Sequence, residues 1–446
     1  MATMEEFMRL KSYARRIRRI AYLPYVRHQD AIFPQDQHAL RVLWSYHESK
    51  DHPLFPNLRQ VEFVKAVHAV NCLDIFLVTK SISLSLYWSD FKFDGLFISA
   101  FRIICRIIEE CALNMEQLDL GSFQAGSAEN VIQETQSLSN LVCKMAELRG
   151  LATGLHPLNL DALCHLASLP RLHKLQAPNT SKDILESIRT MHGVVFPELR
   201  QLTLHETDLP SLTQLIVRLK PLQLRELTVF IQTVLTATDI HATFSALQKW
   251  TQRNHLHHLV LQPIRDPNRW RWARESTGHI IIDGSILEPL LSFRNLTVVE
   301  LNLPCAFELG DREIKSMAEA WPRLRRLQLG ALNGWNIPPS VTCMGLLALV
   351  RNCRELEYLA LSLNGSGDSV PPRSSLTPAD VNTKITYLYV GNGEIKSVDT
   401  KRVSQFLLYI FPRLCGIGGK WLYDRRTDLD KWENVVGCLK GVDNAA

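Results

Sequence analysis

Leucines recur along the chain in a short motif, L-x-x-L-x-L, that is followed by a longer apolar stripe. Between Phe196 and Lys220, the motif is carried by Leu199, Leu202 and Leu204. Leu202 and Leu204 alternate with polar residues, which predicts a short strand with one apolar face. After Asp208, a helix-capping residue type, apolar residues recur at the spacing of an amphipathic helix: Leu212, Leu215, Ile216 and Leu219.

Copies of this strand-and-helix unit recur at intervals of roughly 25 to 33 residues. The first apolar residue of each motif, here called the anchor, is found at Leu58, Met115, Leu148, Leu172, Leu199, Leu224, Leu256, Leu296, Leu324, Leu356, Ile385 and Leu414. Two further strands are expected at Tyr13–Leu23 and, in a degenerate copy, at Lys80–Trp88. One strand and one helix cannot bury their apolar faces alone, so the units must stack on each other.

These spacings predict an α/β fold, a leucine-rich-repeat solenoid of irregular repeats. In this curved horseshoe, parallel strands line the concave face and helices cover the convex face. We expect one array over 1–446, with an N-terminal cap region in 1–50, repeats in 51–425 and a capping helix and tail in 426–446. Several helices should end at apolar-proline pairs, because proline disfavours helical geometry in the residue before it: Leu169-Pro170, Phe196-Pro197, Trp321-Pro322 and Phe411-Pro412.

The charge balance favours a protein partner over a polyanion. Lysine and arginine total 50 against 45 for aspartate and glutamate, so we expect neither nucleic acid nor a membrane as partner. The 10 cysteines form no C-x-x-C pair, and the N-terminus lacks an apolar signal segment. A cytoplasmic or nuclear protein is therefore expected, and Arg15, Arg16, Arg18 and Arg19 form either a solvated strand face or a nuclear signal.

No group of residues has the spacing of a catalytic, cofactor or metal site. Cys164 and His165 are adjacent on a predicted helix, where their side chains diverge, so a buried thiol beside an exposed imidazole is expected. His255 and His257 share a strand face from which His258 turns away, which leaves too few ligands for zinc. We therefore predict a non-enzymatic chain without cofactors.

Binding is expected on the concave face, where the residues at anchor plus two, four and six alternate with the buried leucines. The tryptophan-rich insertion DPNRWRWARE is a second candidate, because tryptophan and arginine are enriched at interface hot spots. The equal alternative is that its tryptophans attach a long loop to the solenoid. The candidate contact residues are Gln201, Thr203, His205, Phe230, His258, Gln262, Trp270, Trp272, Glu300, Arg326, Tyr358, Tyr387 and Tyr389. This mixed, moderately aromatic set suits a protein or peptide.

Several segments, in order, resemble the leucine-rich-repeat region of basidiomycete (mushroom-type) fungal F-box proteins. They include YARRIRRI at Tyr13, LFPNLRQVEF at Leu54, GLLALVRNCRELEYLALSLNG at Gly345 and KWENVV near the C-terminus. The resemblance implies the substrate-recognition part of an SCF-type ubiquitin ligase, whose F-box docks a Skp-type adaptor and, through it, a cullin.

The F-box itself is not found in this sequence, because the 12 residues before Tyr13 contain no such segment. Adaptor and cullin binding are thus expected only if an F-box is restored upstream. The alternative is a free-standing repeat scaffold or decoy. A GTPase-activating or other enzymatic role is a more remote alternative, for which no residue can be named.

Overall fold

The computed structural model divides the chain into two compact units, residues 1–205 and 206–446, which are described separately. It describes residues 9, 12–22, 55–63, 73–77, 82–87, 95–111, 114–121, 128–154, 156–178, 195–218, 223–231, 236–249, 255–263, 280–330, 335, 337–391, 393–418, 431, 432, 434, 435 and 437. No helix among these residues is both long enough and apolar enough to cross a membrane.

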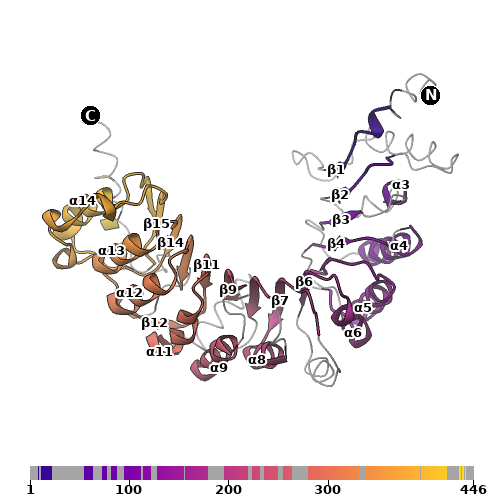
Figure 1. Cartoon of the computed structure of the whole chain (residues 1–446), viewed down its shortest axis with the longest axis horizontal. Coiled ribbons are helices and arrows are strands. Elements are labelled where there is room, and N and C mark those ends of the chain that lie inside the picture. Colours follow the sequence, from indigo (N-terminus) through magenta and orange to yellow (C-terminus); the bar gives the residue numbers. More distant parts are fainter. Residues whose placement is uncertain are drawn as a thin grey trace. The chain divides into compact units, whose positions relative to one another are not determined.

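The first unit is a row of parallel strands that pair in chain order (Figure 1). The strands are β1 (Arg19–Tyr22), β2 (Gln60–Phe63), β3 (Ser83–Leu86), β4 (Gln117–Asp119), β5 (Gly150–Ala152), β6 (Lys174–Pro178) and β7 (Gln201–Thr207). The helices are α3 (Leu73–Leu77), α4 (Gly95–Cys111), α5 (Ala128–Cys143) and α6 (Leu160–Ser168). α4 packs on α5 and α5 on α6, so the helices form a layer of their own.

The second unit repeats this arrangement with β8 (Glu226–Ile231), β9 (His258–Pro263), β11 (Val298–Leu301), β13 (Arg326–Leu329), β14 (Tyr358–Ala360), β15 (Tyr387–Tyr389) and β16 (Gly416–Gly418), again parallel and in that order. Its α-helices are α8 (Leu209–Arg218), α9 (Ala237–Gln248), α11 (Gly284–Leu287), α12 (Asp311–Ala320), α13 (Cys343–Asn352) and α14 (Thr400–Ile410). Short 3-10 turns follow α11 (η3, Glu288–Ser292) and β14 (η4, Gly367–Ser369; η5, Arg373–Ser375; η6, Pro378–Asp380), and another precedes α14 (η7, Ser397–Asp399).

A separate two-stranded parallel pair, β10 (Ile281–Asp283) with β12 (Ala306–Glu308), lies beside the main strands of the second unit. β10 leads into α11, and β12 is followed by α12. This pair therefore places the starts of two helices next to each other.

The predicted anchors are buried, and a strand begins two residues after each of them. Leu199 and Leu324 have no exposed surface, and β7 and β13 begin at Gln201 and Arg326. Because the leucine spacing is local, it sets strand position and buried face together. The predicted repeat array with parallel strands is confirmed within each unit, whereas the division of 1–446 into cap, repeats and capping helix stays a prediction.

The two irregular strand predictions differ in outcome. The degenerate copy is confirmed, because β3 occupies Ser83–Leu86 with Leu84 and Leu86 buried. The first strand is shorter than expected, since β1 begins only at Arg19 and the backbone around Ala14 is helical. Ala14 is buried, so this turn packs against the unit instead of extending the sheet.

Local chemistry sets the helix ends. Thr342 is the N-cap of α13, and its side-chain oxygen accepts from Met344 N at 3.2 Å. Asp208 accepts from Ser211 N at 2.8 Å at the start of α8. At the other end, α12 and α14 stop at Trp321 and Phe411, the residues that precede proline, as predicted.

Candidate functional site

The strands of the second unit bury one face and leave most of the other accessible, with Gln328 on β13 and Ala360 on β14 as buried exceptions. β8 and β9 alternate half-buried and buried residues along their whole length. We call the accessible side of β8, β9, β11, β13, β14, β15 and β16 the strand face. It is the surface that the sequence assigned to partner binding.

Three candidates, Gln201, Thr203 and His205, lie on the accessible side of β7 in the first unit, and all are half-buried. His205 Nε2 is 3.0 Å from Gln176 Nε2 on β6. Burial lowers the pKa of His205 to about 4, so its imidazole is neutral at pH 7.

In the second unit, Phe230, His258 and Gln262 are half-buried on the strand face. His258 Nδ1 lies 3.8 Å from a carboxylate oxygen of Glu226 on the neighbouring strand. The candidates Trp270 and Trp272 lie outside the described residues.

The five remaining candidates form one connected group, here called the tyrosine–arginine cluster: Glu300, Arg326, Tyr358, Tyr387 and Tyr389. They come from four neighbouring strands, β11, β13, β14 and β15. Strand register places Arg326 directly beside Tyr358, and Ala360 beside Tyr389. The parallel register thus gathers side chains that are far apart in sequence.

Arg326 links the charged and aromatic parts of this cluster. Its Nε donates to Glu300 Oε1 at 3.0 Å, and its guanidinium carbon lies 4.3 Å from the centroid of the Tyr358 ring. A cation over an aromatic face at this distance is attracted by the ring quadrupole. Arg326 is held on both sides, and its side chain remains exposed.

The tyrosine rings continue the contact across β14 and β15. The centroids of Tyr358 and Tyr389 are 5.8 Å apart, and those of Tyr387 and Tyr389 are 4.9 Å apart. A Cβ atom at Gly416 would lie 2.6 Å from Tyr387 Cε2, and one at Gly418 would lie 2.5 Å from the Tyr387 hydroxyl. The ring of Tyr387 therefore packs against β16 at Gly416 and Gly418, which have no side chains.

The hydroxyls of Tyr358 and Tyr387 stay protonated at neutral pH. Burial raises the pKa of Tyr358, with a further increase from Tyr389 and an opposing decrease from Arg326. Burial also raises the pKa of Tyr387. Each of these phenols is consequently a hydrogen-bond donor and acceptor on an aromatic surface, a combination that is enriched at protein interfaces.

The residues considered for catalysis do not form a catalytic group. Cys164, expected to be buried, is half-buried, and burial raises the pKa of its thiol. His165 is also half-buried, with Nε2 3.1 Å from the Met145 carbonyl oxygen. The described part of the chain holds no set of three histidine, cysteine or acidic side chains placed to bind a metal ion.

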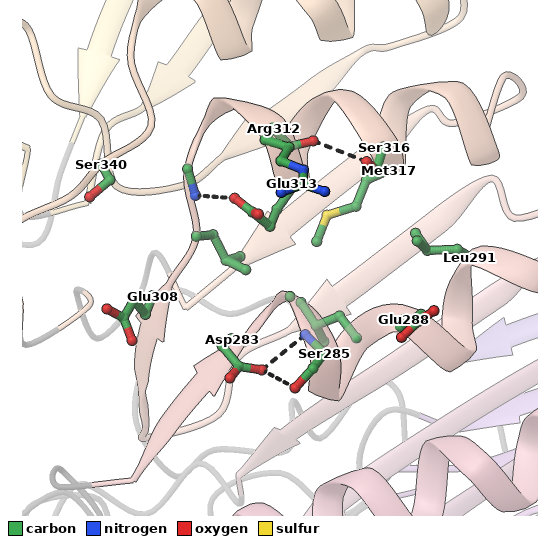
Figure 2. A pocket seen from close by; sticks show the side chains of 14 residues that line it. Asp283, Ser285, Glu288, Leu291, Glu308, Arg312, Glu313, Ser316, Met317 and Ser340 are labelled. Carbon is green, nitrogen blue, oxygen red and sulfur yellow. Dashed lines mark hydrogen bonds between the residues drawn. The ribbon is translucent and has the colours of Figure 1, made fainter.

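An open cavity of about 650 Å³ lies where β10 and β12 meet the helices that follow them (Figure 2). Asp283 Oδ1 accepts from the backbone N of Ser285 at 2.9 Å, and Glu313 Oε2 accepts from Gly310 N at 2.9 Å. These carboxylates cap the starts of α11 and α12. Other lining residues include Glu288, Glu308, Arg312, Ser316, Met317 and Ser340.

Sequence reasoning missed two ionisable pairs that include buried side chains. In the first unit, His156 Nδ1 lies 3.2 Å from Glu134 Oε2, and both side chains are buried. In the second, Arg351 makes two hydrogen bonds to buried Asp380. Asp380 has a local signal, the T-x-x-D capping pattern with Thr377. Glu134 on α5 and His156 in the loop before α6 have none.

Comparison with known proteins finds similarity among solved structures but none in sequence. No family model matches the sequence, and no curated protein matches it. Among solved structures, the chain is similar to a chain of the crystal structure of the Rad7 and Elc1 complex in yeast, with 13% sequence identity and a TM-score of 0.38. The similarity covers 95% of this chain and 92% of that chain.

Proposed function

We propose that this chain is a leucine-rich-repeat solenoid that binds a protein target through its strand face. The observation that carries the proposal is the tyrosine–arginine cluster, in which three tyrosine rings and one arginine form a continuous accessible group. Tyrosine and arginine are the residue types most often responsible for binding energy at interfaces. The proposed role is non-catalytic binding without a cofactor.

Selection from a displayed peptide library tests this binding role, because it requires no target to be chosen beforehand. Peptides enriched on the purified chain are resynthesised, and their affinities are measured by fluorescence anisotropy. Removing the Tyr358 and Tyr389 rings in Tyr358→Ala/Tyr389→Ala should weaken binding by about tenfold or more, as loss of a hot spot does.

A matched control removes two exposed apolar side chains elsewhere in the same unit, Met344 on α13 and Val398 near α14. Met344→Ala/Val398→Ala should leave peptide affinity unchanged. Equal losses in both double variants, or no selectable peptide at all, would refute strand-face recognition.

We further propose that the bound target is a substrate of an F-box type ubiquitin ligase. This assignment is supported by the ordered resemblance of the repeats to fungal F-box proteins, and it requires an F-box upstream of the present sequence. The test is to express the chain with its upstream coding sequence and to ask whether a Skp-type adaptor and a cullin co-purify. If the chain bound its target but neither the adaptor nor the cullin co-purified, the ligase role would be rejected in favour of a free-standing scaffold or decoy.

A further inference from the structure

A strip of positive charge borders the strand face of the second unit. At the edge where the strands begin, basic residues lie next to the anchors Leu224, Leu256 and Leu324. Another lies two residues before the anchor Leu296. We call this group the arginine edge; it comprises Arg225, His255, His257, Arg294, Arg323 and Arg325. The four arginines are exposed, and the two histidines are half-buried.

Backbone hydrogen bonds place members of this group on successive rungs. His257 N donates to the Arg225 carbonyl oxygen at 2.8 Å, and Thr297 N donates to that of His257 at 2.8 Å. Arg325 N then donates to the Thr297 carbonyl oxygen at 2.7 Å. With strands spaced about 4.8 Å apart, Arg225 and Arg325 are about 14 Å apart along the edge.

Among the described residues, none of the four arginines of the edge makes an ion pair or a side-chain hydrogen bond, although Arg325 interacts electrostatically with Glu355. In the first unit, Arg149, Arg171 and Arg200 at corresponding positions each pair with a glutamate within 3.5 Å, whereas Arg59 makes no such pair among the described residues. Even the nearby Arg326 has its own carboxylate, Glu300. The arginine edge is therefore a local excess of unpaired positive charge in a chain whose formal net charge is only +5.

Stabilisation of the preceding helices is a competing explanation, since cations near helix C-termini are favourable. Arg354 illustrates a cation used structurally, because its Nη1 donates to the Ala379 carbonyl oxygen. No such side-chain bond is made by Arg225, Arg294, Arg323 or Arg325 within the described structure. Their charge remains available to an external anion.

We infer that the arginine edge binds an acidic, extended peptide segment of the target protein. This inference rests on the proposed function and adds the chemical class of the target. At about 3.4 Å per residue, the 14 Å between Arg225 and Arg325 matches about four residues of extended chain. Acidic residues at every second position would then face the arginines and pair with their guanidinium groups.

The neighbouring residues favour a peptide over a nucleic acid. Glu226 directly follows Arg225, and Glu300 lies further along β11 on the strand face. A broad phosphate surface that extended from the edge onto the strand face would meet both carboxylates, whereas one peptide segment along the edge would not reach Glu300. The described edge positions from Arg225 to Arg325 contain no phenylalanine, tyrosine or tryptophan on which unpaired bases could stack. On the next rung, Glu357 N donates to the Arg325 carbonyl oxygen, so a glutamate ends the basic strip.

Fluorescence anisotropy with defined probes tests this inference. The probes are a fluorescein-labelled (Glu-Ser)₅ peptide, the neutral (Gln-Ser)₅ peptide and a single-stranded DNA 10-mer. The acidic peptide should bind about tenfold more tightly than the neutral one, and its affinity should fall as salt rises. Arg323→Glu/Arg325→Glu should weaken binding of the acidic peptide by about tenfold or more.

Arg373→Glu/Lys401→Glu is the charge-matched control, because it reverses two exposed cations elsewhere in the second unit. It should change the affinity less than about twofold, as expected for charges away from an interface. Arg225→Glu/Arg294→Glu provides a second edge variant in case the first fails to fold, as judged by circular dichroism.

Three results would overturn the inference: equal affinity for the acidic and neutral peptides, equal losses in edge and control variants, or tighter binding of the DNA. These results can be separated from failure of the proposed function. Suppose that binding of library-selected peptides depends on Tyr358 and Tyr389 but not on Arg323 and Arg325. The proposal of strand-face recognition would then stand, and the inference of an acidic target would be wrong.

Discussion

The guanidinium of Arg326 lies over the ring of Tyr358, with 4.3 Å between its central carbon and the ring centroid. A nearby cation favours the ionised phenolate and lowers the pKa of a tyrosine. Arg326 acts in this way on Tyr358, although burial raises the pKa overall.

Arg326→Ala should therefore raise the pKa of Tyr358 further. The pKa can be followed by NMR of protein carrying ¹³C-labelled tyrosine, with Tyr358→Phe to assign the signal. Arg325→Ala removes an adjacent exposed charge without the ring contact and should have a smaller effect. An unchanged Tyr358 pKa in Arg326→Ala would show that the cation and the ring are not in contact in solution.

Leu202 and Thr203 are neighbours on β7 that face opposite sides of the strand. Leu202 is buried, whereas Thr203 is half-buried on the accessible side. Leu202→Asp should lower the free energy of unfolding by about 3 to 5 kcal/mol, because it places an unpaired charge in the core.

Thr203→Asp is the control for that substitution and should cost less than about 1 kcal/mol, as a change on the accessible face. Urea unfolding measures both variants. If Leu202→Asp were as stable as the wild type, or if Thr203→Asp lost more free energy of unfolding than Leu202→Asp, the buried face of the strand would have been assigned wrongly.

The leucine pattern predicted the repeats well because its information is local. Leu324 and Leu327 determine where β13 begins and which face is buried, whatever the rest of the chain does. The same pattern assigned Tyr358 and Tyr389 to the accessible face. It could not predict their ring contact, which depends on strand register and on side-chain rotamers.

Long-range ionic contacts could not be predicted from the sequence, because they join residues that are far apart along the chain. Asp380 could be recognised as a capping residue from Thr377, three positions earlier, but its partner Arg351 lies 29 residues away. The arginine edge was equally hidden, because arginines are common in this sequence. Only the structure distinguishes Arg200, which pairs with Glu198, from Arg294, which makes no ion pair among the described residues.

Asp380 is buried and receives two hydrogen bonds from Arg351, Nε to Oδ1 at 2.6 Å and Nη2 to Oδ2 at 3.1 Å. Thr377 N also donates to Oδ2, at 2.8 Å. Asp380→Asn should lower the free energy of unfolding by about 2 kcal/mol, because charge-assisted hydrogen bonds are lost from a buried group.

Glu355→Gln is the control, because it weakens an exposed pair with Lys384 and should lower the free energy of unfolding far less than Asp380→Asn. Acid adds a second test. The hydrogen bond from Arg351 lowers the pKa of Asp380 to about 2, below the unfolded value of about 3.9. The stabilisation from Asp380 is thus complete above about pH 4 and is lost as the pH falls towards 2, a loss that Asp380→Asn should not show.

His205 gives the first unit its own sensitivity to acid, in a higher pH range. Burial lowers its pKa to about 4, below the value of about 6.5 expected in the unfolded chain. Below pH 6.5 the unfolded chain therefore binds a proton that the folded chain does not, so stability falls as the pH decreases from 6.5 towards 4.

His205→Gln removes this group, and the midpoint of thermal unfolding should then decline less over that interval. His241→Gln, at an exposed position on α9, is the control, and its midpoint of thermal unfolding should change with pH as that of the wild type does. Identical pH profiles for His205→Gln and wild type would mean that His205 is not buried in solution.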